Sequence, residues 1–172
     1  MSLAFSPPFT PPDRLVPTLR QDGYAVLSPQ GVADWLGTPL AQFEALHGDW
    51  AQLPPDEYLK DGGRYRTRRH ACFTVDGGAL EQAPHRAHWQ PVEYNALHGG
   101  MQRWFAPMEA ATVAQPAWQQ LMRGLGEVAS GMRGAQRWYV EAHQFRIDTA
   151  DGIGRPTPQR AHPQGVAPGG VA

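Results

Sequence analysis

The sequence has one cysteine, no long apolar run and no excess of charge of either sign, and each absence excludes a class of protein. Cys72 has no partner within the chain for a disulfide, which fits a reducing cytoplasm. No stretch of eighteen apolar residues is present, so we expect no transmembrane helix. The first residues lack the basic and apolar regions of a signal peptide. We therefore expect a cytoplasmic protein.

Charge and local motifs exclude further functions. Lysine and arginine number 15 against 16 acidic residues, giving a net charge of −1, so we expect neither a nucleic-acid-binding face nor membrane attachment. The chain also lacks an internal repeat, a glycine-rich phosphate loop and a serine nucleophile elbow.

Glycine, proline and tryptophan are abundant instead. The 19 glycines and 17 prolines together make 36 of 172 residues, about a fifth of the chain, where about 12% is usual. Six tryptophans argue against disorder. A chain of this length favours one domain with a sizeable core. The composition predicts many turns between short elements that are packed together by aromatic side chains.

Hydrophobic periodicity predicts a sheet supported by helices. Helices are expected over 13–21, from Thr38-Pro39 onward and over 117–132, and strands over 23–28, 64–75 and 136–148. Shorter extended segments are expected at 80, 92–94 and 102–105. The core stripe expected for the long helix is Trp118, Leu121, Met122, Leu125, Val128, Ala129 and Met132. Both faces of 136–148 are well filled, which predicts a strand covered on both sides and an α+β domain.

Several polar residues of the predicted strands are candidates for binding. The side chains of Arg64, Arg66 and Arg68 share one strand face, where they either clamp a carboxylate or pair with acidic residues for structural reasons. Gln144 and Arg146 share a face of the later strand and either line a pocket or serve the sheet. Cys72 is expected to be a small buried residue without a nucleophilic role.

The segment after the last predicted strand has the form of a metal-binding turn. Gly154-Arg-Pro-Thr-Pro158 delivers His162, and Gln164 stands where a His-x-Asp pair has its acid. Such a pair with a distant second histidine forms the facial triad of non-haem Fe(II) enzymes. His85 and His88 have the spacing of a helical metal pair, but Pro84 and the loop context argue against a helix there.

Three spaced motifs carry a resemblance to a known family. They are 138–148 followed by 154–158 and His162, the segment 64–73, and the segment 94–105. In this order they resemble the bacterial 2OG-Fe dioxygenase family of the L-isoleucine dioxygenase and BsmA type, over roughly residues 20–166. That family has a strand ending in H-Q-F-R-I, followed by P-T-P-E-G-x-H-x-D-G.

The resemblance implies a fold, an activity and a cofactor set. The fold is a partial double-stranded β-helix, or jelly roll, of the cupin-like kind, with supporting helices. The activity is hydroxylation of a small amino-acid-like substrate with Fe(II), 2-oxoglutarate and O2. His162 becomes the first iron ligand, with Gln164 at the position of the family's aspartate. For Arg66, Arg68, Gln144 and Arg146 we expect substrate or cosubstrate binding.

The resemblance also defines the expected organisation of the chain. We expect a proline-rich arm and short helix over 1–22, the N-terminal part of a dioxygenase domain over 23–166, and an irregular tail over 167–172. The family's distal histidine and its 2-oxoglutarate-binding arginine lie beyond residue 172, which favours a truncated chain with impaired turnover. The alternative is a non-catalytic remnant or partner-binding pseudoenzyme that associates with itself through exposed strand edges.

Overall fold

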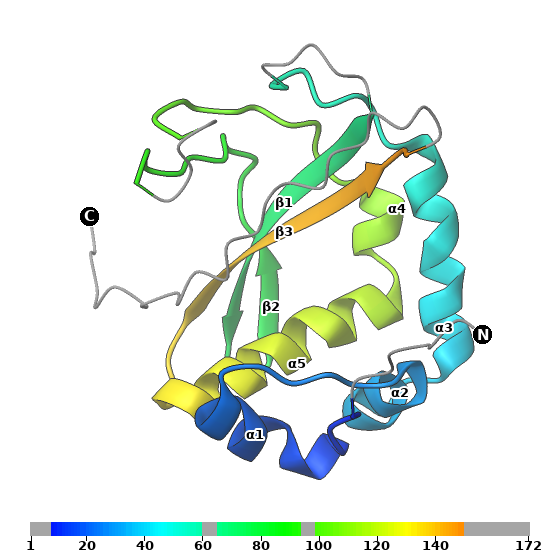
Figure 1. Cartoon of the computed structure of the whole chain (residues 1–172), viewed down its shortest axis with the longest axis vertical. Helices are drawn as coiled ribbons and strands as arrows, with labels where there is room; N and C mark the ends of the chain where they lie inside the picture. Colours follow the sequence, from blue (N-terminus) through cyan, green and yellow to red (C-terminus); the bar gives the residue numbers. More distant parts are fainter. Residues whose placement is uncertain (1–7, 60–64, 94–98, 150–172) are drawn as a thin grey trace, which may run out of the picture.

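The computed structural model describes residues 8–59, 65–93 and 99–149. Their centre is an antiparallel three-stranded sheet of order β2-β1-β3, drawn in Figure 1. The strands are β1 (Arg66–Asp76), β2 (Ala79–Gln82) and β3 (Trp138–Ile147). Gly77 and Gly78 have positive φ and close the tight hairpin between β1 and β2, a conformation that glycine adopts without strain.

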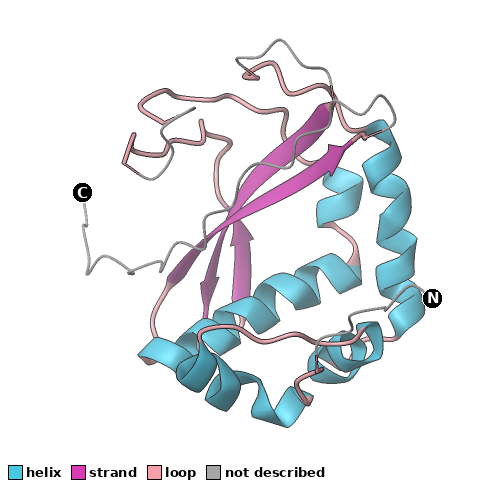
Figure 2. Cartoon of the chain, viewed as in Figure 1, coloured by secondary structure: helices cyan, strands magenta, loops and turns pink. Residues whose placement is uncertain are grey.

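The helices lie on one side of this sheet and the long loops on the other (Figure 2). The helical elements are η1 (Pro12–Arg14), α1 (Leu15–Asp22), α2 (Pro29–Leu36), α3 (Leu40–Glu44), η2 (Ala45–Gln52), α4 (Ala110–Val113) and α5 (Pro116–Arg133). Contacts of α5 with β1 on one side and with α1 and α2 on the other make it the middle layer. Among the described residues, no helix has the length and apolar character needed to cross a bilayer.

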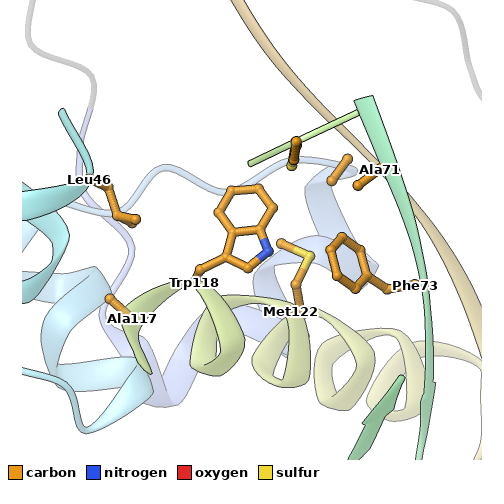
Figure 3. Close-up of a cluster of buried hydrophobic side chains, with 8 residues drawn as sticks. Leu46, Ala71, Phe73, Ala117, Trp118 and Met122 are labelled. Atoms are coloured by element: carbon orange, nitrogen blue, oxygen red, sulfur yellow. The ribbon is translucent and has the colours of Figure 1, made fainter. Parts of the chain in front are cut away.

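The hydrophobic core lies between α5 and one face of the sheet. Ala71 and Phe73 of β1 and Ala142 of β3 meet Trp118 and Met122 of α5, most of which Figure 3 shows together. Because side chains alternate along a strand, the intervening residues of β1 and β3 face away from the helices. The core therefore fixes which residues are left for the opposite face.

The central strand β1 is hydrogen-bonded along both edges. One edge pairs with the whole of β3, in the register Arg68↔Phe145, His70↔His143 and Cys72↔Glu141. The other edge pairs in turn with β2, with the segment around Pro107 and with the segment around Pro55. This pairing holds β1 rigidly and aligns its outward-facing side chains with those of β3.

The structure confirms the long predicted elements and corrects several short ones. The predicted helix 13–21 and the strands 64–75 and 136–148 are present, as is the helix 117–132. Residues 23–28 form no strand: Gly23 N donates to Leu19 O and Ser28 O accepts from Val32 N at the flanking helices, and Val26 O accepts from Thr10 N at 2.6 Å. Residues 92–93 form a turn, and within 102–105 only Arg103 pairs, in a bridge with His88.

Helix starts and faces also differ from expectation at particular residues. Helix α2 was not expected, although Ser28 Oγ caps it by accepting from Gly31 N at 2.9 Å and Pro29 begins it. At Thr38 the hydroxyl donates to Leu36 O instead of capping α3. Leu125 is exposed, since Gly124 and Gly126 face the neighbouring elements in its place. The prediction that both faces of β3 are covered is wrong for the described part of the chain, because Tyr139 and Phe145 are about half exposed.

Candidate metal centre

The sheet face opposite α5 gathers histidine, glutamate and arginine side chains. His70 of β1 and Glu141 and His143 of β3 share this face, and His88 reaches it from the loop after β2. One ligand atom from each of these four residues lies within 4.8 Å of the others. Imidazole nitrogens and a carboxylate are ligands that Zn²⁺ and Fe²⁺ accept. We call these four residues the His/Glu cluster.

Backbone pairing explains how the four side chains meet. His70 and His143 are direct partners in the β1–β3 register, and their rings stack with centroids 4.7 Å apart. His88 is held by two backbone bonds with Arg103, of 2.9 and 3.0 Å. Its Nδ1 lies 2.9 Å from Glu141 Oε2. Two elements of the sheet and one loop bridge therefore position the cluster.

Burial keeps two of the imidazoles neutral. Burial lowers the pKa of His70 to about 4, with smaller opposing and reinforcing effects from nearby charges. It lowers the pKa of His143 to about 3, and the adjacent Arg68 charge adds to this effect. For Glu141, burial alone would raise the pKa, but the hydrogen bond and charge of His88 lower it overall. At neutral pH His70 and His143 are thus neutral imidazoles and Glu141 is an ionised carboxylate, the protonation states that metal ligands need.

Arg68 lies between this cluster and a small cavity. Its Nη2 is 2.7 Å from His143 Nδ1, and its guanidinium lies 3.7 Å above the centroid of the Phe105 ring. Burial lowers the pKa of Arg68 to about 10, so the group stays charged at neutral pH. The cavity has a volume of about 290 Å³, and its lining includes Arg68, Tyr58, His85, Trp104 and Phe105.

A buried carboxylate holds the arginines of β1. Asp56 accepts a 2.7 Å bond from Arg66 Nε, and its carboxylate lies 3.6 Å from Arg68 Nη1. The Asp56 side chain is fully buried, so these pairs are little screened by water. Structural pairing with an acid, one of the two roles left open for these arginines, is therefore present. Arg66 is occupied in this way, whereas Arg68 also borders the cavity.

The remaining candidates from the sequence lie elsewhere. Gln144 is buried on the α5 side of the sheet, and its amide makes no hydrogen bond within the described residues. Arg146 lies on that same side, 3.8 Å from Asp148, and lines a separate cavity of about 130 Å³. Cys72 is buried as expected. Arg64, His162 and Gln164 fall outside the described residues.

Sequence reasoning did not identify the His/Glu cluster. The spacing of Glu141 and His143 places both on one face of a strand, and His70 shares a face with the arginines of β1, so part of the signal was visible. The approach of His88 depends on its pairing with Arg103, and no local pattern encodes that pairing.

Comparison with known proteins identifies the family. The model of a family described as 2OG-Fe dioxygenase matches residues 47–171, which is most of the chain. This chain belongs to the 2OG-Fe dioxygenase family. Family members depend on Fe(II) and 2-oxoglutarate. No curated protein matches the sequence.

Two solved structures resemble the family member described here. One is a BsmA homolog from Methylobium petroleophilum PM1, with a TM-score of 0.81 and 46% identity over 89% of this chain and 62% of that one. The other is IDO from Bacillus thuringiensis, with a TM-score of 0.59 and 16% identity over 79% of this chain and 57% of that one. The second likeness shows the fold alone. The chain thus spans less than two thirds of the length of either structure.

Proposed function

We propose that this dioxygenase-family chain takes part in hydroxylating a small amino-acid-like substrate, on a jelly-roll scaffold that residues 23–166 begin. The observation that carries the proposal is the charged Arg68 beside both the His/Glu cluster and a cavity of about 290 Å³. That volume is near the lower end for small-molecule pockets. A small substrate or cosubstrate with a carboxylate suits a cavity of this size and charge.

The donor types on this face fit the family's metal. His70, His88 and Glu141 supply two imidazoles and a carboxylate, the set that non-haem Fe(II) prefers, and His70 Nδ1 is buried without a hydrogen-bond partner in the described structure. By resemblance, His162 is the first iron ligand, with Gln164 at the position of the family's aspartate. When bound, Fe(II) and 2-oxoglutarate supply the oxidation of a carbon–hydrogen bond by O2.

The residues that line the cavity bind a carboxylate group, hold it in one orientation and shield it from water. Arg68 binds a carboxylate of 2-oxoglutarate or substrate, since its guanidinium is held in place by Asp56 and by the Phe105 ring. Tyr58 holds the aromatic side of the cavity in place. Its hydroxyl accepts a 2.9 Å hydrogen bond from Trp104 N, and its ring packs edge-on against Phe105 with the ring centroids 5.3 Å apart. Trp104 and Phe105 provide apolar surface that limits water around the bound carboxylate.

Succinate formation tests the proposal. The purified chain is supplied with Fe(II), 2-oxoglutarate and O2, and succinate is measured with and without a panel of free amino acids. We expect an amino acid to stimulate succinate formation, and Arg68→Met to raise the KM for 2-oxoglutarate or amino acid about tenfold or more. Arg146→Met is the matched control, because Arg146 lies on the other side of the sheet.

The alternative has its own outcome in the same experiment. The family's aspartate is replaced by Gln164, whose neutral amide is a weaker Fe(II) ligand than a carboxylate. If a folded chain forms no succinate with any amino acid, the impaired or non-catalytic partner-binding role is favoured instead. An equal effect of Arg68→Met and Arg146→Met would remove Arg68 from the proposed binding role.

A further inference from the structure

The cavity beside Arg68 carries both signs of charge on its wall. Arg68 is the basic residue of its lining and Glu57 the acidic one. The Arg68 guanidinium is already held by Asp56 and by His143, but a guanidinium has five N–H donors, so donors remain for a ligand. Glu57 is exposed and has no ion-pair partner among the described residues. A ligand in this cavity therefore meets a fixed cation and an available carboxylate.

Backbone pairing holds the segment that carries Glu57 against the strand that carries Arg68. Arg68 N donates to Pro54 O at 2.9 Å, and Asp56 N donates to Arg66 O at 2.9 Å. The Asp56 carboxylate also lies 3.6 Å from Arg68 Nη1. Glu57 follows Asp56 directly, and consecutive Cα atoms are about 3.8 Å apart. The sheet thus keeps the two charges of the cavity wall close together.

Tyr58 adds a hydrogen-bond donor to the same wall. Its hydroxyl oxygen accepts from Trp104 N at 2.9 Å, and its own proton has no acceptor among the described residues. Its ring packs edge-on against Phe105, which fixes the position of the hydroxyl. A phenol proton and a guanidinium can bind the two oxygens of one carboxylate. Arg68 and Tyr58 therefore suit the negative group of a ligand, and Glu57 remains for a positive group.

From this geometry we infer that Glu57 is a specificity-determining residue, which binds the ammonium group of a zwitterionic substrate while Arg68 and Tyr58 bind its carboxylate. The inference rests on the proposed function, because it takes this cavity as the substrate site. A free amino acid bears both charges on one carbon and matches the wall. Glu57 repels 2-oxoglutarate, which has a second carboxylate and no cation, so the cavity selects the substrate over the cosubstrate. An acylated amino group carries no charge and is also disfavoured.

Calorimetry with matched analogues tests the role of Glu57. The metal-free chain in EDTA is titrated with free amino acids, and the tightest binder is compared with its N-acetyl derivative, its deaminated acid and 2-oxoglutarate. We expect the free amino acid to bind about tenfold more tightly than each of the other three. Glu57→Gln should weaken binding of the amino acid about fivefold or more, and should leave binding of the deaminated acid unchanged or tighter. Arg68→Met should weaken binding of both.

Glu127→Gln is the matched control, because Glu127 is exposed on α5, the helix that packs on the other face of the sheet. It should leave every Kd unchanged. If no free amino acid binds, or if Glu57→Gln weakens the amino acid and its deaminated acid equally, the inference is overturned. A folded Arg68→Met chain that binds the amino acid as tightly as the wild type would also overturn it.

The inference and the proposed function fail in different ways. Calorimetry measures no turnover, so the expected binding pattern without any succinate formation would support the role of Glu57 and contradict hydroxylation by this chain. Succinate formation that an amino acid stimulates, with the same KM for that amino acid in Glu57→Gln and in the wild type, would do the reverse.

Discussion

The guanidinium of Arg68 donates to Nδ1 of His143 at 2.7 Å, a contact that joins the charged wall of the cavity to the buried imidazoles of the sheet. His143 in turn stacks on His70, with ring centroids 4.7 Å apart. Neutral rings can stack in this way, whereas two protonated rings beside an arginine would repel one another strongly. The arrangement therefore depends on both histidines staying uncharged.

Acid should destabilise the metal-free chain through His70 and His143. Their pKa values in the folded state are lowered to about 4 and about 3, so the unfolded chain, with pKa values near 6.5, binds protons first as pH falls. Stability is then lost from about pH 6.5 downward, until the folded state also protonates. The charged and titratable groups that face these rings are Arg68, Cys72, His85, His88 and Glu141.

Denaturant unfolding in EDTA at several pH values measures this effect. Near pH 4.5 we expect each histidine to contribute a loss of about 2 kcal/mol in the free energy of unfolding. His143→Gln should lower stability near pH 7 but reduce the slope between pH 6.5 and 4.5. A slope unchanged by His143→Gln would show that other groups cause the acid sensitivity.

Asp56 should be essential for stability. Its buried carboxylate is the counterion of Arg66 and Arg68, and it also accepts a 2.9 Å bond from Tyr58 N. Asp56→Asn leaves the two guanidinium groups without that charge in a buried setting, so we expect a loss of about 3–5 kcal/mol. Glu81→Gln is the control, because its pair with Arg137 is exposed and worth at most about 1 kcal/mol. Similar losses in the two variants would contradict this account.

The parts of the fold that could be predicted are those encoded by local periodicity. In α5 the spacing of Trp118 and Met122, and in β1 and β3 the alternation of side chains, identify long elements and their faces. Residues 23–28 have a strand-like composition but meet no neighbouring strand, so propensity alone misassigned them. The candidate site needed the register His70↔His143 and the bridge His88↔Arg103, which are long-range pairings. Sequence patterns do not specify such pairings.

Close packing between α5 and β1 explains why Leu125 is not part of the core and leads to a prediction at Gly126. A Cβ atom built on Gly126 would be 2.9 Å from Val75 Cβ and 2.5 Å from its Cγ1, closer than real contacts. Gly126→Ala should therefore cost about 1–3 kcal/mol of stability despite alanine's better helix propensity. Gly48→Ala, where nothing lies within 4 Å, should be neutral or stabilising. Thermal melts of both variants measure the difference, and equal melting temperatures would disprove the tight contact.

The open edge and exposed aromatic side chains of β3 predict that copies of this chain associate with one another. Its outer edge has no strand partner in the described residues, and Tyr139 and Phe145 on its open face are 47% and 50% exposed. Unpaired strand edges with apolar side chains favour pairing between copies, and a lysine on such a strand opposes it. We expect sedimentation velocity to show concentration-dependent association that Phe145→Lys reduces. Trp89→Lys is the control, since Trp89 is similarly exposed but lies outside the sheet. Association that is lost equally in both variants would indicate nonspecific apolar contact, and a monomer at all concentrations would show that the β3 edge does not pair in solution.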